Sequence, residues 1–184
     1  MKLELIYTSR EAALAYENID AADNFKLADG PAYGSAHAAA FDLRAILDNP
    51  LTLLPGEQHM IKTGIKLNMR SVEEYILPGM KLAALILPRS GRGTKEGLCI
   101  ANTIGLIDED YLGEITFAAW ARPTSGHVNT GNGRLGGTPI FIEPGERIGQ
   151  LMFVYAPRFE FGVVDQFSTT TERGEGGYGS TGKA

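Results

Sequence analysis

Cysteine is almost absent: this sequence of 184 residues contains one, Cys99. A single cysteine excludes an internal disulfide, and it is compatible with a reducing compartment, so we expect a cytoplasmic protein. Cys99 lies in the short apolar run LCI. We therefore expect it to be buried as a small hydrophobic residue.

An excess of positive charge and a cluster of histidines are also missing. The formal net charge is −5, from 17 Lys and Arg against 22 Asp and Glu. Broad nucleic-acid binding depends on clustered basic residues, so nucleic acid is not an expected partner, although a few basic residues in one cleft can bind a nucleotide. His37, His59 and His127 lie far apart without metal-ligand spacing. We assign them no role.

Long hydrophobic runs are missing as well. The first residues, MKLELIY, alternate between polar and apolar types, and no run is long enough for a signal peptide or a membrane span. With 43% hydrophobic and 21% charged residues, the composition is that of an ordinary globular domain. We expect no membrane partner and a single domain over residues 1–172.

Helical periodicity is scarce, whereas glycine (23 residues) and proline (9 residues) are plentiful. Short apolar runs recur between turn signals such as Pro55–Gly56 and Pro144–Gly145, which favours an all-β sandwich, barrel or jelly roll. One helix is predicted over Ser9–Ala22 with Ser9 as its cap, a loop being the alternative. The expected strands are Leu3–Tyr7, Leu51–Leu54, Ile61–Leu67, Leu82–Leu87, Ile115–Trp120, Ile140–Ile142, Leu151–Tyr155 and Phe159–Val164.

Two glycine-rich polar stretches interrupt this pattern. Arg122–Pro139 has almost no apolar content, and we expect it to be a long exposed loop inside the domain. Residues 173–184 are predicted to form a flexible C-terminal arm that a ligand orders. The segment Gly177–Lys183 imitates a Walker A loop, but Ala184 stands where Ser or Thr should bind magnesium.

Several polar groups at strand ends could carry chemistry. Arg89, Ser90 and Gly91 follow an apolar run and offer a guanidinium, a hydroxyl and an open backbone, which suits a phosphate cradle or a plain polar turn. The segment Asn102–Glu114 is predicted to form a β-hairpin, in which Asp108 could hold a water and take its proton. Because aspartate also favours turns, that motif alone is weak.

Four further residues leave two interpretations open. In the tail, Arg173 could neutralise phosphate and Tyr178 could stack on a base, or the tail could simply be disordered. Arg147 and Gln150 are either polar groups in a cleft or residues at a strand edge.

Five segments, taken in order, resemble the five motifs of the trimeric dUTPase family. They are AAAFDLRA (Ala38–Ala45), PRSGRG (Pro88–Gly93), GLIDEDYLGE (Gly105–Glu114), ERIGQL (Glu146–Leu151) and RGEGGYGSTG (Arg173–Gly182). The resemblance covers nearly the whole chain from about Ala38 onward, and five ordered motifs are far more specific than one. It implies a jelly-roll-like β-barrel of the β-clip type, assembled as a homotrimer with shared active sites and a closing C-terminal arm.

The resemblance also implies the reaction and its participants. The enzyme would hydrolyse dUTP to dUMP and pyrophosphate by water attack at the α-phosphate with Mg²⁺, lowering dUTP and supplying dUMP for thymidylate synthesis. Asp108 would position and deprotonate the water, Asp42 would help to hold Mg²⁺ through water, and Tyr111 would exclude a 2′-hydroxyl. The other implied substrate-binding residues are Arg89, Ser90, Gly91 and Gln150 at the phosphates, Asn102, Gly105, Leu106 and Ile107 at the nucleoside, and Arg173, Tyr178, Gly179, Ser180 and Thr181 in the arm.

Two alternatives share the same fold. A dCTP deaminase-type relative needs a glutamate on the strand after the hairpin, where this chain has Ala118. A nucleotide-dependent regulatory protein would be free to lose Asp108, which is present. The stretches Ser9–Tyr33, Ser71–Met80 and Arg122–Pro139 look longer than a minimal member of the family needs, and they could cap the trimer, contact an unknown protein partner or do nothing.

Overall fold

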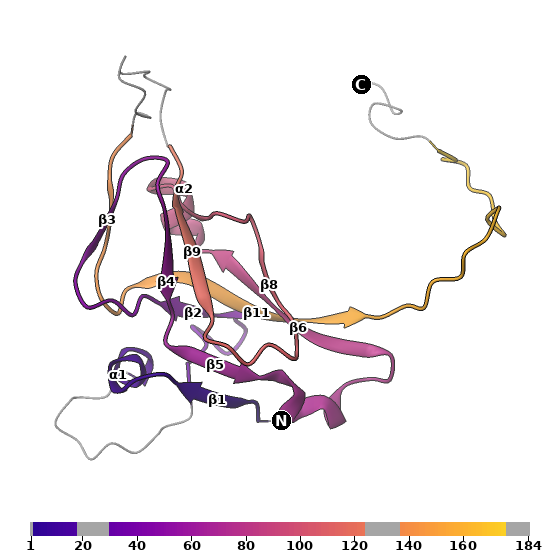
Figure 1. Cartoon of the computed structure of the whole chain (residues 1–184), viewed down its shortest axis with the longest axis horizontal. Helices are drawn as coiled ribbons and strands as arrows, with labels where there is room; N and C mark the ends of the chain where they lie inside the picture. The colour runs from indigo at the N-terminus through magenta and orange to yellow at the C-terminus, as the bar shows by residue number, and fades with distance from the viewer. Residues whose placement is uncertain (1, 18–29, 124–136, 176–184) are drawn as a thin grey trace.

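The structure, a computed structural model, describes residues 2–17, 30–123 and 137–175. These residues are mostly extended, which confirms the expected all-β class (Figure 1). The elements are β1 (Glu4–Tyr7), α1 (Arg10–Glu17), β2 (Ala40–Arg44), β3 (Leu51–Leu53), β4 (Gln58–Lys62), β5 (Ile65–Asn68), the 3₁₀-helix η1 (Met69–Tyr75), β6 (Met80–Pro88), α2 (Ser90–Lys95), β7 (Leu98–Ile100), β8 (Gly105–Ile107), β9 (Thr116–Ala121), β10 (Ile140–Ile142) and β11 (Arg147–Pro157).

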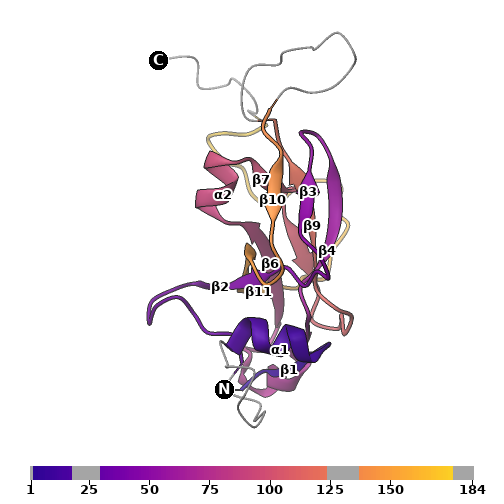
Figure 2. The same ribbon diagram turned by 90° about the vertical axis from the view of Figure 1, so that its left-hand side faces the viewer.

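The described strands pair in four antiparallel sheets. The largest has the order β2-β11-β6-β8, and a second has the order β4-β9-β7. The pairs β1-β5 and β10-β3 complete the set. The long strand β11 organises the largest sheet, because it pairs with β6 from Gly149 opposite Pro88 to Pro157 opposite Met80, and with β2 on its other edge. Helix α1 and β1 lie together at one end of the molecule, away from α2 (Figure 2).

Strand alternation decides which side chains enter the core. In β9 every second residue is buried, and Phe117 is fully buried. In β2 the same period of two buries Phe41 and Leu43 and turns Asp42 to the other face. Gly149 of β11 lies against the Phe117 ring, where an added Cβ would come within 2.6 Å of Cε2. The packing of the core therefore fixes which face of the largest sheet presents polar groups.

The predicted N-terminal helix is confirmed, although it is described only as far as Glu17. The Ala12 amide donates a hydrogen bond to Ser9 Oγ at 3.1 Å, so Ser9 caps the helix as expected. Buried Tyr16 donates to the Thr63 carbonyl oxygen at 2.8 Å and accepts from the Arg44 amide at 3.0 Å, which ties α1 to β2. Burial raises the pKa of Tyr16 to about 12, so this hydroxyl keeps its proton at neutral pH. The rest of the predicted helix, up to Ala22, lies outside the described residues.

Two predicted strands are wrong. Ile61–Leu67 is divided into β4 and β5, because Gly64 between them has a φ of +74°, which L side chains rarely adopt. The segment Phe159–Val164 follows β11 without strand structure, and Phe161 and Val163 are 93% and 99% exposed. Its alternating pattern indicates a strand, but no strand in the described chain pairs with it. In Figure 1 this segment leaves the body of the molecule after β11.

Two smaller expectations concern Cys99 and membrane-spanning helices. Cys99, on β7, is half-buried rather than buried. No α-helix among the described residues has the length and apolar character needed to span a membrane.

Candidate functional site

The register of the largest sheet gathers three of the predicted site residues. Gln150 on β11 lies opposite Asp42 on β2 and opposite Leu87 on β6. Arg89 follows two residues after Leu87, at the point where β6 ends and α2 begins. Segments that are far apart in the sequence therefore lie side by side across β2, β11 and β6 (Figure 1). We call Asp42, Arg89 and Gln150 the strand-held cluster.

Two guanidinium groups surround the carboxylate of this cluster. Arg89 Nε lies 2.9 Å from Asp42 Oδ1, and Arg147 donates to Asp42 Oδ2 at 3.3 Å. One carboxylate against two arginines leaves a local formal charge of +1, which suits an anionic ligand. Arg147 lies opposite Arg44 on β2, and this pairing brings it into the site. It stands three residues before Gln150 on β11.

The second arginine of PRSGRG has a structural role instead. Arg92 donates to Glu96 Oε2 at 2.8 Å and to the Phe141 carbonyl oxygen at 2.8 Å, and it forms an ion pair with Glu146. Its side chain is only 11% exposed. These contacts fasten α2 to the turn before β11, so the donors of Arg92 are already occupied.

The first turn of α2 is open to solvent. Ser90 and Gly91 are both exposed. A Cβ added at Gly91 would meet nothing within 4 Å, so packing in the described chain does not require glycine there. An open backbone at this position agrees with the predicted phosphate cradle, in which a ligand approaches closely.

The predicted hairpin in Asn102–Glu114 is wrong in its pairing. Strand β8 pairs with β6, from Gly105 opposite Ile86 to Ile107 opposite Ala84, and not with β9. Gly105 allows this close approach, because an added Cβ would lie 3.0 Å from Ile86 Cβ.

The turn before β8 places the predicted nucleoside contacts. The Ile104 amide donates to the Asn102 carbonyl oxygen at 2.7 Å, and Thr103 has a positive φ of 64°. Asn102 is exposed, and Leu106 is 61% exposed. Both are thus accessible to a ligand or to a second chain.

Asp108 is the first residue after β8, and it is exposed. Its carbonyl oxygen accepts a hydrogen bond from the Tyr111 amide at 3.1 Å, which closes a turn. The Tyr111 hydroxyl then donates to the Glu114 carbonyl oxygen at 3.1 Å. A Cβ at Gly113 would overlap the Tyr111 ring, so glycine there lets the ring fold back over the chain. Asp108 and Tyr111 are therefore coupled through one compact turn.

Within one chain, Asp108 lies far from the strand-held cluster. Extending the β6–β8 register puts Asp108 opposite Ala83, four residues along β6 from Leu87, and β2 is three strands away from β8. At about 3.3 Å per residue and about 4.8 Å per strand, the separation between Asp42 and Asp108 is on the order of 20 Å. A phosphate at Arg89 is out of reach of Asp108 of the same chain.

The C-terminal arm is described only in part. Arg173 is exposed, in a turn where the Gly174 amide donates to the Thr171 carbonyl oxygen at 3.1 Å. The predicted arm residues Tyr178, Gly179, Ser180 and Thr181 lie outside the described residues.

The acidic residues allow a magnesium site of one kind. The described residues contain no group of three or more His, Cys, Asp or Glu side chains able to hold a metal. Asp42 Oδ1 is buried and meets Arg89 as an ion pair without a well-aligned hydrogen bond. Mg²⁺ keeps several waters and is bound through one or two carboxylates plus substrate phosphates. Asp42 thus fits as an outer contact to a hydrated ion.

Comparison with known proteins decides the family. The sequence model of the dUTPase family matches residues 27–182. The chain belongs to the dUTPase family. It is 44% identical over 153 residues to the deoxyuridine 5′-triphosphate nucleotidohydrolase of Paraburkholderia xenovorans, covering 83% of this chain and 88% of the relative. The enzyme of the same name from Sodalis glossinidius is 41% identical over 162 residues, covering 88% and 90%.

Solved structures of phage dUTPases share the fold. A mutant dUTPase of Staphylococcus bacteriophage 80alpha with dUpNHpp has a TM-score of 0.65 at 22% identity, covering 99% of each chain. A mutant dUTPase of phage phi11 of S. aureus, described with a structural Mg(II) ion, has a TM-score of 0.63 at 20% identity, covering 92% of this chain and 100% of that one. The predicted jelly-roll-like dUTPase fold is confirmed.

Proposed function

We propose that this chain hydrolyses dUTP to dUMP and pyrophosphate. The observation that carries the proposal is membership of the dUTPase family over residues 27–182, among relatives named as deoxyuridine 5′-triphosphate nucleotidohydrolases. The strand-held cluster and the adjacent Arg147 support it independently, because two arginines against the single carboxylate of Asp42 leave a positive charge that suits a polyphosphate. The enzyme lowers dUTP and supplies dUMP for thymidylate synthesis.

The chemistry assigns each part of the site a task. A triphosphate carries about four negative charges, which must be neutralised before water attacks. Arg89 and Arg147 supply positive charge, while Ser90 and Gly91 offer a hydroxyl and a backbone N–H. Asp42 would help to hold a hydrated Mg²⁺ through water, and the ion would supply further positive charge against the phosphates. Because Arg89 is paired with Asp42, it would exchange part of this contact for a phosphate oxygen when substrate binds.

The attacking water needs a base, and we assign this role to Asp108. The water oxygen bonds to the α-phosphorus, the bond from that phosphorus to the pyrophosphate oxygen breaks, and the water proton passes to the Asp108 carboxylate. Tyr111 packs under the sugar, where its ring leaves no room for a 2′-hydroxyl. Asn102 and the β8 backbone from Gly105 to Ile107 would contact the nucleoside.

Shared sites in a homotrimer complete the proposal. The separation between Asp108 and the strand-held cluster means that one chain brings together only part of the site. The exposed apolar segment after β11 offers the connection, with Phe161 at 93% and Phe167 at 90% exposure. Exposed apolar surface of this kind marks interaction sites. Packed on a neighbour, it would carry Arg173 and the arm toward another chain's phosphates.

The main experiment measures turnover of dUTP and dCTP with and without Mg²⁺, together with mass by light scattering. We expect magnesium-dependent pyrophosphate release from dUTP, no deamination of dCTP, and a trimer. Ala118 on β9 has no carboxylate to transfer protons, so the deaminase alternative is not favoured. A monomer that is fully active would contradict the shared sites, and deamination of dCTP would contradict the assigned reaction.

Three finer parts of the proposal concern location and partners. The one cysteine, Cys99, supports a cytoplasmic location. The net charge of −5 supports the expectation of no nucleic-acid partner. A protein partner at the extended stretches stays a prediction, since most of Arg122–Pro139 lies outside the described residues.

A further inference from the structure

The sheet stops supporting the chain just before Asp108. The β6–β8 ladder ends with Ile107 opposite Ala84. Beyond it, the Tyr111 amide holds the Asp108 carbonyl oxygen, and among the described residues the Asp108 carboxylate forms no ion pair. On its far side the turn is held through Glu114, whose Oε1 accepts a hydrogen bond from the Gly64 amide at 2.9 Å. On the side of Asp108, one backbone hydrogen bond fixes the shape of the turn but not its position relative to β6, so a further contact is needed there.

Glu109 provides this contact. Its side chain is only 18% exposed, and Lys81 Nζ lies 2.9 Å from Glu109 Oε1. Lys81 stands on β6, three residues before Ala84, on the part of the strand that β8 does not cover. The ion pair therefore joins the turn to β6 where the ladder no longer does.

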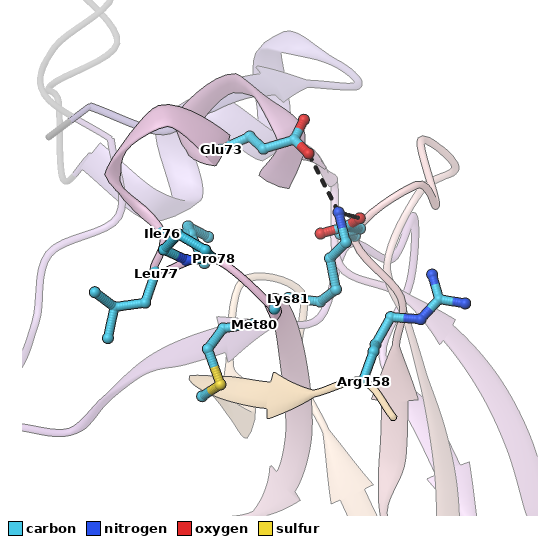
Figure 3. Close-up of a pocket in the computed structure, with 9 residues that line it drawn as sticks. Glu73, Ile76, Leu77, Pro78, Met80, Lys81 and Arg158 are labelled. Carbon is cyan, nitrogen blue, oxygen red and sulfur yellow. Dashed lines mark hydrogen bonds and ion pairs between the residues drawn. The ribbon is translucent and has the colours of Figure 1, made fainter. Parts of the chain in front are cut away.

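Lys81 has a second carboxylate partner on a separate element. Glu73 Oε1 of η1 lies 3.2 Å from Lys81 Nζ, so the ammonium bridges two carboxylates (Figure 3). The hydrogen bond to Glu109, and then that to Glu73, raise the pKa of Lys81, so the charge persists at neutral pH.

The 3₁₀-helix is itself firmly attached. Met69 and Val72 are each 1% exposed. The Ser71 hydroxyl donates to the Asn68 carbonyl oxygen at 2.7 Å and accepts from the Glu4 amide at 3.1 Å. Glu73 is therefore carried by a fixed element, and the bridge can transmit that rigidity to the turn.

We propose that Lys81 is a positioning residue for dUTP hydrolysis: by bridging Glu73 and Glu109 it fixes the turn that carries Asp108. This role rests on the proposed function, in which Asp108 is the base. The base must hold the attacking water in line with the α-phosphorus, and a misplacement of about 1 Å can lower the rate about 10²-fold. Exposed ion pairs add little to stability. The loss of this bridge should therefore lower the rate of hydrolysis strongly and leave the melting temperature nearly unchanged.

The surroundings allow a clean substitution. Lys81 and Glu109 border a pocket of about 280 Å³, whose wall includes Ile76, Leu77 and Met80 (Figure 3). A methionine at position 81 keeps the unbranched stem of the side chain, loses the ammonium group and has apolar neighbours. Lys81→Arg is the conservative partner, because a guanidinium can also bridge two carboxylates. Arg70→Met is the matched control, because Arg70 pairs with Glu73 at 3.7 Å without contacting the turn.

The experiment measures kcat, KM for dUTP and Tm for these variants in the full chain. We expect Lys81→Met to lower kcat roughly 10- to 100-fold with KM within about threefold, because the ground-state contacts to nucleotide remain. Lys81→Arg should recover most of the loss, and Arg70→Met should match the unmodified protein. In a chain that already carries Asp108→Asn, Lys81→Met should cause no further loss in kcat, because no base remains to be positioned.

Different results contradict the positioning role of Lys81 and the assignment of Asp108 as the base. An unchanged kcat in Lys81→Met, or an equal further loss in the Asp108→Asn chain, overturns the positioning role while Asp108 keeps its assignment. Near-normal turnover by Asp108→Asn alone overturns the base and the positioning role with it. If Lys81→Met lowers Tm strongly, Glu109→Gln takes its place in the same comparison, and an unchanged kcat there overturns the role.

Discussion

Two parts of the proposed site are built in opposite ways. In the strand-held cluster, Asp42 and Gln150 lie where β11 is paired with β2 and β6, and Arg89 directly follows the last paired residue of β6, so backbone ladders position the cluster. Asp108 and Arg173 both lie past the ends of strands, where turns and side-chain contacts replace the ladder. In the proposal, phosphate binding thus belongs to the paired strands. Activation of the water and closure over the substrate belong to the Asp108 turn and the C-terminal arm, which act on the site of a second chain.

The largest effect should come from the base beyond the ladder. Asp108→Asn keeps the shape and removes the proton acceptor, so we expect kcat to fall roughly 10²–10⁴-fold with little change in the affinity for a non-hydrolysable dUTP analogue. Asp110→Asn is the matched control and should cost far less. Both carboxylates are exposed, so only the resemblance selects Asp108. Single-turnover hydrolysis decides, and a larger loss from Asp110→Asn would reverse the assignment.

Removal of residues 173–184 tests the second segment beyond a strand end. Turnover should fall on the order of 10³-fold, because an arginine that neutralises phosphate contributes that much in related phosphoryl chemistry. The melting temperature should stay unchanged, since residues 158–175 are exposed and contribute nothing to the core. Mixing Asp108→Asn chains with Arg173→Ala chains should restore part of the activity, because some mixed sites receive both unmodified residues. No recovery on mixing would speak against sharing.

The apolar segment after β11 should hold chains together. Replacing both Phe161 and Val163 with Asp removes apolar burial of about 1.5–3 kcal/mol per side chain if the segment packs on a neighbour. We expect the trimer to dissociate at higher protein concentration, with little loss of secondary structure. Sedimentation over a dilution series measures this, and Glu160→Gln serves as the control in the same segment. An unaffected trimer would show that the segment does not lie at the interface.

The contacts that fasten α2 beside the strand-held cluster should contribute to stability. Arg92→Met would remove the donor to the Phe141 carbonyl oxygen and the ion-pair partner of Glu146 Oε1, and hydrogen bonds to a charged group contribute to stability. We expect a loss of about 1–3 kcal/mol in the free energy of unfolding, measured by urea denaturation. Lys95→Met, on the same helix but exposed, is the control. Equal stability of the two variants would mean that Arg92 does not fasten α2.

The same division explains what could be predicted from the sequence. Strands such as β9 and the long β6 carry enough apolar residues for local patterns to indicate them. Strand β2 has five residues around Asp42, too few for periodicity to show. The alternation in Phe159–Val164 was misleading because alternation indicates a face to be buried, not which chain buries it.

Site geometry was less accessible to local patterns. Asp42 meets Gln150 only through the register of β11, and a register is a property of the whole sheet. Residue type alone could not separate Arg89, which borders the site, from Arg92, which fastens a helix. The five ordered motifs named the site residues, whereas strand register alone could show that Asp108 stands apart from the cluster.

The smallest effect should come from the polar loop between β9 and β10. Its two ends are fixed: the Arg122 amide donates to the Gly97 carbonyl oxygen at 2.9 Å, and Arg122 also donates to the Gly93 carbonyl oxygen at 3.1 Å. On the other side, Gly137 lies beside Pro55, where an added Cβ would come within 3.1 Å of the proline ring. These contacts hold the chain at both ends of the loop.

Residues 124–136 should therefore be replaceable by a short Gly-Ser turn. Loop-closure entropy changes slowly with loop length, so we expect Tm to change little and turnover of dUTP to stay within a few-fold. The control keeps the loop and replaces Arg122 with Met, which removes a contact to the phosphate-binding segment and should cost more. A collapse of turnover in the shortened chain, with the trimer intact, would mean that the loop contributes to the site and that closure depends on more than the C-terminal arm.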